Sequence, residues 1–257
     1  MRNKAELKDF LEKKYRQYNT PDFIATDPVS IPLLFTGKQD IEIAGFLAAT
    51  IAWGQRPTIL RNAQWLLRHM DFDPHAYLLH ASEKELKQFE SFVHRTFNGT
   101  DCRFFMKALR KIYLHFDSLE DLFLVQDDPT ETDYSNNIVR WRKYFFKTDH
   151  EQRTEKHFAD PSAGSAAKRI NMFLRWMVRK DNCGVDPGIW KKTDPARLIC
   201  PLDVHSGRVA RKLGLLKRNA NDWKAAAELT DELRKMDPAD PVKYDFALFG
   251  LGVFERF

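Results

Sequence analysis

Two residues with complementary chemistry stand at the starts of two predicted helices. Lys168 lies in the first turn of "GSAAKRINMFLRWMVRK", and Asp203 opens the helix in "CPLDVHSGRVARKLGLL". The positive end of the helix dipole, the neighbouring Arg169 and partial burial all favour the uncharged amine that a nucleophile requires. A carboxylate fixed by backbone N–H groups suits the stabilisation of developing positive charge. These residue types predict nucleophilic amine chemistry assisted by a carboxylate.

Both residues also have a purely structural interpretation. Lys168 could be one exposed lysine of a basic helix. Asp203 could be the N-cap of its helix, because an aspartate side chain accepts hydrogen bonds from first-turn amides. The cap role and the catalytic role of Asp203 are compatible with each other. His205 is expected to pack or hydrogen-bond locally.

The elements that position these residues are predicted from helical periodicity. Apolar residues recur three and four positions apart through most of the chain, as in the core face expected for Ile170, Phe173, Leu174 and Met177. An acidic connection is expected at 126–135, a long irregular one at 181–200, and no strand of convincing length. The chain is therefore predicted to be all-α, with about ten to twelve helices. Helices are expected around 7–15 and at 40–53, 56–70, 73–81, 82–97, 100–116, 118–125, 136–146, 164–180, 203–216, 221–236 and 240–257.

Composition limits the class of protein. The 257 residues are 43% hydrophobic, which predicts a folded globule of one or two domains. The three cysteines are far apart and fit no disulfide, zinc or iron–sulfur pattern, and His69, His75 and His80 do not share a helix face. No metal or cofactor is therefore expected. No signal peptide and no apolar run of ~18 residues is seen, so a cytoplasmic protein without a membrane partner is predicted.

Positive charge is concentrated in one part of the chain. Residues 160–218 hold 13 Lys/Arg against 5 Asp/Glu, whereas the whole chain has a formal net charge of +5. Such an excess is often only a solvated helix face. It also suits a surface that neutralises phosphates and so releases counterions.

The order of three segments resembles that of the helix-hairpin-helix DNA glycosylase superfamily, which includes endonuclease III and the 8-oxoguanine glycosylases. The segments are "FLAATIAWGQRPTILRNAQWLL", "GSAAKRINMFLRWMV" and "CPLDVHSGRVARKLGLL". The resemblance covers roughly residues 40–253, and the aspartate segment is its most specific part. The whole chain also resembles an uncharacterised conserved bacterial family.

The resemblance implies roles for the two reactive residues. In the bifunctional members, a lysine placed like Lys168 attacks the sugar C1′, displaces the damaged base and forms a Schiff base that permits β-elimination. An aspartate placed like Asp203 stabilises positive charge on the sugar and assists deprotonation of the lysine. The target base must leave the helical stack, because its glycosidic carbon is otherwise out of reach.

The resemblance also implies substrate contacts. Gln55 corresponds to a glutamine that fills the space left by the flipped base, and Trp53 is a candidate for stacking on that base. Asp245 and Phe249 share a helix face, and their spacing matches a polar and an aromatic residue that bind the extruded base in the archaeal 8-oxoguanine enzymes. Gln55 could instead be an ordinary loop residue, and Phe249 and Trp53 could be core residues. The expected contacts to the DNA backbone are Gly164, Ser165, Arg169, Arg208, Arg211 and Lys212.

The sequence departs from the superfamily pattern at the hairpin. "FADPSAGSAAK" has one glycine, Gly164, where the family usually has two, although a helix N-terminus can still hold a phosphate. Lys168 and Asp203 are 35 positions apart, a longer interval that resembles the archaeal 8-oxoguanine type. The four-cysteine cluster of endonuclease III is absent.

The resulting hypothesis is a two-domain DNA glycosylase with AP lyase activity. A helical barrel at 40–180, ending in the hairpin and the lysine helix, is expected to face a second helical subdomain of 1–39 and 181–257 across a cleft. The expected partner is double-stranded DNA with a damaged base, an oxidised purine for example, bound by a monomer. The alternative is a non-catalytic helix-hairpin-helix module that binds DNA or a protein.

Overall fold

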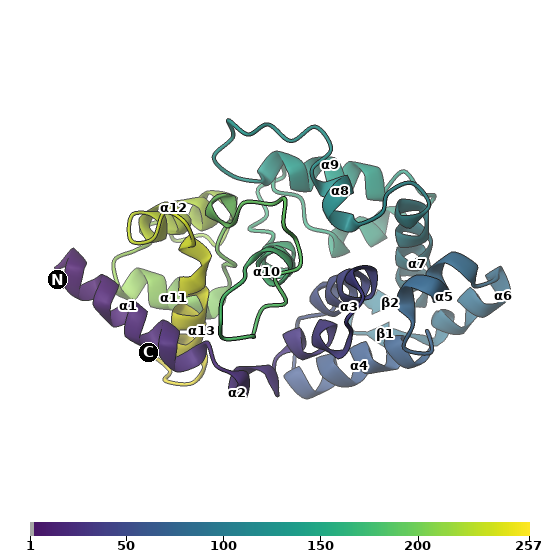
Figure 1. The fold of residues 1–257 in the computed structure, drawn as a ribbon, viewed down its shortest axis with the longest axis horizontal. Coiled ribbons are helices and arrows are strands. Elements are labelled where there is room, and N and C mark those ends of the chain that lie inside the picture. Colours follow the sequence, from purple (N-terminus) through teal and green to yellow (C-terminus); the bar gives the residue numbers. More distant parts are fainter. Residues whose placement is uncertain (1–2) are drawn as a thin grey trace. The chain divides into compact units, whose positions relative to one another are not determined.

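The computed structural model describes residues 3–257 and is built mostly of helices (Figure 1). Within those residues the only sheet is an antiparallel pair of two-residue strands, β1 (Val93–His94) and β2 (Phe97–Asn98). The all-α prediction is therefore confirmed. The chain divides into two compact units. We call Thr26–Asp128 with Asn136–Ala159 the central unit, and we call the chain up to Ala25 with Pro129–Ser135 and Asp160–Phe257 the terminal unit.

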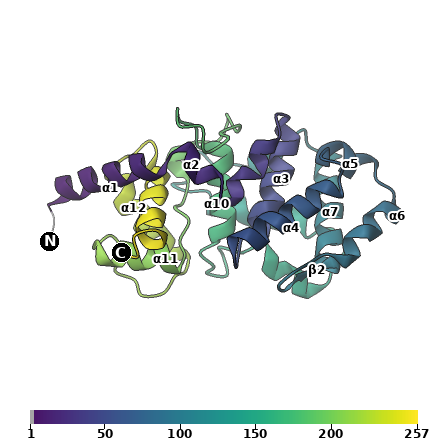
Figure 2. The ribbon, with the colours of Figure 1, turned by 90° about the horizontal axis from the view of Figure 1, so that it is seen from below.

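The central unit is organised around one apolar helix, α3. Ten consecutive residues of α3, from Ile41 to Thr50, are buried, and the helix packs against α4 and α5, which lie beside it in Figure 2. A helix that is apolar on all sides is stable only when neighbouring elements cover every face. The elements of this unit are η1 (Pro28–Ser30), η2 (Pro32–Leu34), α3 (Lys38–Thr50), α4 (Arg56–Arg68), α5 (Pro74–His80), α6 (Glu83–Leu86), η3 (Lys87–Ser91), β1, β2, α7 (Gly99–Tyr113), α8 (Leu119–Phe123), α9 (Ser135–Phe145, whose first residue belongs to the terminal unit) and η4 (Gln152–His157).

Aromatic side chains fill the core of the central unit. The Phe46 ring of α3 lies 5.2–5.9 Å, between centroids, from four rings of α7, α9 and the segment after η4. Most of these pairs are tilted or edge-to-face, the arrangements that aromatic quadrupoles favour. The four rings are Phe105, Trp141, Phe145 and Phe158.

The terminal unit brings both ends of the described chain together. Its last helix, α13, packs against α1 and α11, as Figure 1 shows for α1. Glycines allow this packing: a Cβ on Gly250 would lie 2.1 Å from the Tyr18 ring, and one on Gly252 would lie 3.2 Å from His205. The elements of this unit are α1 (Lys4–Tyr18), α2 (Pro21–Ile24), α10 (Lys168–Val178), η5 (Pro195–Arg197), α11 (Val204–Lys212), α12 (Trp223–Arg234), η6 (Pro241–Tyr244) and α13 (Asp245–Val253).

The helix predicted at 82–97 is wrong in its second half. The helical segment ends at Ser91, and the chain then forms the β1–β2 hairpin. Arg95, in the turn, has a φ of 56°, which a continuous helix does not allow. Asn98 must also be extended, because it is the N-cap of α7 and its side chain accepts from the Asp101 amide. The capping requirement of α7 thus takes precedence over helical periodicity.

The division of the chain differs from the predicted boundaries at both ends. Residues 26–39 belong to the central unit, where η1 and η2 pack against α3. The lysine helix α10 belongs to the terminal unit rather than to a barrel at 40–180. The amides of Gly188 and Trp190 bond to carbonyls of α10, at 3.0 and 2.7 Å, so the irregular connection after α10 folds back onto it.

Candidate active site

Asp203 is the N-cap of α11. Its Oδ1 accepts from the amides of His205 and Ser206 at 2.8 and 3.0 Å, and the Ser206 hydroxyl accepts from the Asp203 amide at 2.9 Å. Burial raises the pKa of the Asp203 carboxyl, but Lys168 and the two amides outweigh burial and leave the pKa below its ordinary value. The predicted cap role is confirmed, and it leaves Oδ2 to face Lys168.

Lys168, predicted in the first turn of a helix at 164–180, is the first residue of α10, which begins four residues later than expected, and it faces Asp203. The Lys168 Nζ lies 3.7 Å from Asp203 Oδ2, and the two side chains are 28% and 26% exposed. An ion pair that is open to solvent contributes only about 0–1 kcal/mol to stability. The pair is therefore a weak structural link between two helix starts, and both reactive groups remain accessible to a ligand.

The hairpin before α10 sets the position of Lys168. Gly164 has a φ of 86° and Ala167 a φ of 46°, both in the left-handed region, so the chain turns sharply into the helix. The amides of Gly164 and Ser165 bond to the carbonyls of Pro161 and Asp160. The backbone of Ser165 also forms an isolated antiparallel β-bridge with Asp222. The amides of Gly164 and Ser165 are thus engaged within the protein and do not themselves clamp a phosphate here, while contact of these two exposed residues with DNA stays a prediction.

The start of α10 offers a different anion-binding feature. Its N-cap residue is Ala167, which has no side-chain acceptor to cap the first-turn amides. Uncapped first-turn amides together with the helix dipole favour a bound anion. Arg169, also in this turn, is half-buried, and burial lowers the pKa of its guanidinium to about 10.

The three basic residues of α11 have structural contacts of their own. Arg208 donates to the Gly252 carbonyl at 3.1 Å. Arg211 donates to the carbonyls of Arg218 and Ala220 and so fastens the loop after α11. Lys212 lies 4.9 Å from the centre of the Phe257 ring. Arg211 and Lys212 also line a groove of about 720 Å³, roughly 13 Å along α11 from Asp203.

The base-binding role predicted for Asp245 is corrected by its burial. Asp245 is 6% exposed and accepts a hydrogen bond from the buried Arg175 of α10. Burial raises the pKa of the Asp245 carboxyl to about 6, opposed by Arg175 and Lys168 and reinforced by Asp203. Its carboxylate is committed to an internal ion pair and is not presented to a ligand.

The other predicted substrate residues have packing contacts. Phe249 is half-buried, and its ring lies 5.8 Å from that of Phe23 and 6.2 Å from that of Phe254. Trp53 packs edge-on against the His94 ring at 4.9 Å. Gln55 is exposed at the N-cap of α4, and its side chain makes no capping bond. Trp53 and Gln55 belong to the central unit, whereas Lys168 and Asp203 belong to the terminal unit.

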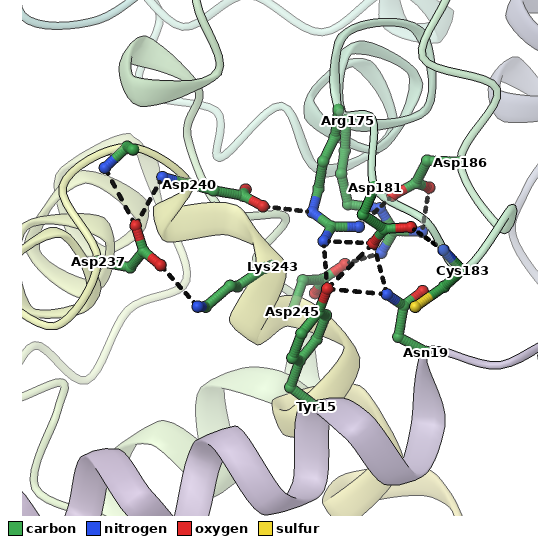
Figure 3. A network of polar contacts seen from close by, with 12 residues as sticks. Tyr15, Asn19, Arg175, Asp181, Cys183, Asp186, Asp237, Asp240, Lys243 and Asp245 are labelled. Carbon is green, nitrogen blue, oxygen red and sulfur yellow. Dashed lines mark hydrogen bonds and ion pairs between the residues drawn. The ribbon is translucent and has the colours of Figure 1, made fainter.

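A buried charge network beside Asp245 was missed by the sequence analysis (Figure 3). Arg175 lies 3.2 Å from Asp186 as well as bonding Asp245. Four residues later, just after the end of α10, Arg179 contacts Asp186, Asp240, Asp181 and the Tyr15 hydroxyl at 2.7–3.0 Å. Two of the cations that make residues 160–218 basic are thus neutralised internally. Helical spacing in sequence could show that the two arginines share a face, but not which carboxylates meet them.

Two kinds of feature are absent from the described residues, 3–257. No group of three or more His, Cys, Asp or Glu residues in that range is placed to hold a metal ion. None of its helices is both long enough and apolar enough to cross a membrane.

Comparison with known proteins identifies a family. The model of a family described as "Protein of unknown function (DUF2400)" matches residues 27–254. The chain belongs to the DUF2400 family. The DUF2400 match includes Lys168, Asp203, Arg175 and Asp245, whereas Tyr15 precedes it. No curated protein and no solved structure gives a significant match to this DUF2400 chain.

Proposed function

We propose that this protein is a DNA glycosylase with AP lyase activity, in which Lys168 is the nucleophile and Asp203 the stabilising carboxylate. The observation that carries the proposal is the 3.7 Å separation between the Lys168 Nζ and Asp203 Oδ2, in a pair open to solvent. The two residues come from different helix starts 35 positions apart, so the fold rather than the local chain brings them together.

The arrangement suits a reaction in which positive charge develops on a sugar. The Lys168 nitrogen forms a bond to C1′ while the C1′–N glycosidic bond breaks and its electron pair leaves with the base. The new amine loses a proton and the sugar ring opens at its oxygen, which gives a Schiff base. Loss of a C2′ proton then expels the 3′ phosphate. Asp203 is ionised at neutral pH because its pKa is lowered, so it can stabilise the cationic sugar and accept a proton from the amine.

The start of α10 supports a phosphate-bearing substrate. The N-cap residue of α10, Ala167, supplies no side-chain cap, and this helix start stands next to the reactive amine. A phosphate bound there would place the adjoining sugar near Lys168. Arg208, an exposed residue on the second turn of α11, is the basic residue of that helix proposed to contact the same backbone.

Borohydride trapping tests the proposal. The protein is incubated with duplexes that contain 8-oxoguanine, uracil, an oxidised pyrimidine or an abasic site, and sodium borohydride reduces any Schiff base to a stable adduct. We expect a covalent complex with at least one duplex and none with Lys168→Ala. Lys217→Ala, which removes an exposed lysine outside the pair, is the matched control and should trap like the wild type.

Two results would count against the proposal. Trapping by Lys168→Ala at the wild-type level would assign the amine elsewhere. Salt-sensitive binding to every duplex with no trapping would favour the alternative, a DNA-binding module without catalysis.

A further inference from the structure

Arg175 ties the lysine helix to two other segments. It lies seven residues, or two turns, after Lys168 on α10, so the two side chains share a helix face. The Arg175 guanidinium, 3% exposed, donates to Asp245 of α13 and lies 3.2 Å from Asp186 in the connection after α10. It also lies 4.3 Å from the centre of the Phe246 ring. These contacts fix the rotation of α10 about its own axis and hence the direction in which Lys168 points.

Asp245 is coupled to the reactive pair as well as to Arg175. The charged groups that influence it are Arg175 and Lys168 from α10 and Asp203 from the start of α11. Cys200 lies three residues before Asp203, and burial keeps the pKa of its thiol well above the ordinary value. The negative charge of Asp245 raises the pKa of this thiol further. Asp186 acts on Asp245 through their shared partner, Arg175.

We propose that Asp245 is a positioning residue for the Lys168–Asp203 pair, which holds α10 in place through Arg175 when it is ionised and releases it when it is protonated. The proposal rests on the function proposed above. An ionised carboxylate attracts the Arg175 guanidinium through opposite charge, and this attraction is lost when the carboxyl is neutral. Protonation of Asp245 therefore weakens the link to Arg175 and leaves Asp186 as the charged partner of that guanidinium.

Burial raises the pKa of the Asp245 carboxyl to about 6 and so sets the pH range of the effect. Arg175 lowers this pKa, which means that the ionised carboxylate favours the arrangement paired with Arg175, and this pairing gives the sign. Above this pKa the carboxylate is ionised and α10 is held, and the hold is lost as the pH falls through 6. A misplacement of about 1 Å at a reacting atom can cost roughly a hundredfold in rate. The reaction is therefore expected to be sensitive to the ionisation of Asp245, although this carboxylate does not touch the substrate.

The test compares single-turnover trapping rates of the wild type and Asp245→Asn from pH 5 to pH 8, on whichever duplex traps best. Asparagine keeps an acceptor for Arg175 but carries no charge. We expect the wild type to be about ten to a hundred times faster at pH 8. The ratio of the two rates should fall about five- to tenfold between pH 8 and pH 5, where about nine-tenths of Asp245 is protonated and neutral. The ratio of the two rates at each pH removes the effects that are common to both proteins.

A ratio that does not change with pH would overturn the proposal, because a merely structural role of the side chain has no titration step near pH 6. Asp231→Asn is the matched control, since Asp231 is exposed and pairs with Arg234 on the same helix. Its rate should equal that of the wild type at every pH. If Asp245→Asn does not fold, the trapping rate of Arg175→Lys tests the proposal instead. Lysine keeps the positive charge, but its single ammonium group cannot bind Asp245 and Asp186 together as the forked guanidinium does. An undiminished trapping rate in Arg175→Lys at pH 8 would also overturn the proposal.

A second readout needs no DNA and so separates this proposal from the proposed function. Lys168 is acetylated with the N-hydroxysuccinimide ester of acetate at pH 8, and its labelling rate is followed by peptide mass spectrometry. Asp245→Asn removes the negative charge that interacts with Lys168, so the labelling rate of Lys168 should rise about threefold or more, with that of Lys217 unchanged. An unchanged Lys168 rate would overturn the coupling even if the wild type trapped no duplex. Faster labelling with slower trapping is the expected signature of an amine that is reactive but misplaced.

Discussion

At the scale of single residues, Asp203 combines two roles that substitutions can separate. Its Oδ1 caps α11 and its Oδ2 faces Lys168. Asparagine caps a helix about as well as aspartate but has no charge. The free energy of unfolding of Asp203→Asn should therefore lie within about 0.5 kcal/mol of that of the wild type. Its trapping rate should fall about a hundredfold or more, because it lacks the charge that stabilises the sugar cation.

Asp203→Ala supplies the control for this prediction. It removes the cap as well as the charge, so its free energy of unfolding, measured in urea, should be ~1 kcal/mol lower than that of Asp203→Asn. If Asp203→Asn traps as fast as the wild type, the carboxylate is only a cap, and the catalytic assignment fails.

The residue scale also shows what sequence can and cannot predict about the site. The positions of Lys168 and Asp203 at helix starts follow from local signals: apolar periodicity, a turn glycine and a capping residue. The role predicted for Asp245 failed because it depends on Arg175, which lies 70 positions earlier. No local pattern reports which charge a buried carboxylate will meet.

At the scale of elements, the approach of α13 to its neighbours depends on two glycines, which differ in how much space a Cβ atom would have. A Cβ on Gly250 would overlap the Tyr18 ring at 2.1 Å, whereas one on Gly252 would lie 3.2 Å from His205. Alanine gains about 1 kcal/mol over glycine inside a helix. Gly252→Ala should therefore be close to neutral, while Gly250→Ala should lose about 1–3 kcal/mol through overpacking.

Thermal unfolding of the two alanine variants checks this order. Equal melting temperatures would show that the Tyr18 ring moves aside without cost. The comparison is matched, because both positions lie on α13 and carry the same substitution.

Helices were predicted more reliably than the faces they bury. The expected core residues of α10 are buried, but so is every residue from Ile170 to Val178. Arg175 is included in this set, although periodicity would assign a charged residue to the solvent side. The burial is possible because Asp245 and Asp186 neutralise the guanidinium, and this information lies in the tertiary structure.

At the scale of the whole molecule, the chain forms two compact units, and the stability of each unit can be measured separately. Asp181 belongs to the terminal unit and links two of its helices. It accepts from Asn19, at the end of α1, at 2.6 Å and from Arg179, just after α10, at 2.7 Å. Burial raises the pKa of the Asp181 carboxyl, but Arg179 and the other donors outweigh burial and lower the pKa from 3.8 to about 2.

The sign of this shift predicts an acid-dependent loss of stability. A carboxyl with a lowered pKa in the folded state stabilises the protein above its unfolded pKa, near 4, and stops doing so as the pH falls towards 2. Asp181→Asn should therefore lower the free energy of unfolding by about 1 kcal/mol at pH 7, a value reduced for solvent screening. Wild type and variant should converge near pH 2.

Urea unfolding at pH 2–7 measures the difference, with Asp231→Asn as a control that should follow the wild type throughout. Because Asp181 contacts only the terminal unit in this network, a separate transition of the central unit should be unchanged. A difference between wild type and Asp181→Asn that stays constant down to pH 2 would contradict the assignment of this carboxylate as the link between α1 and α10.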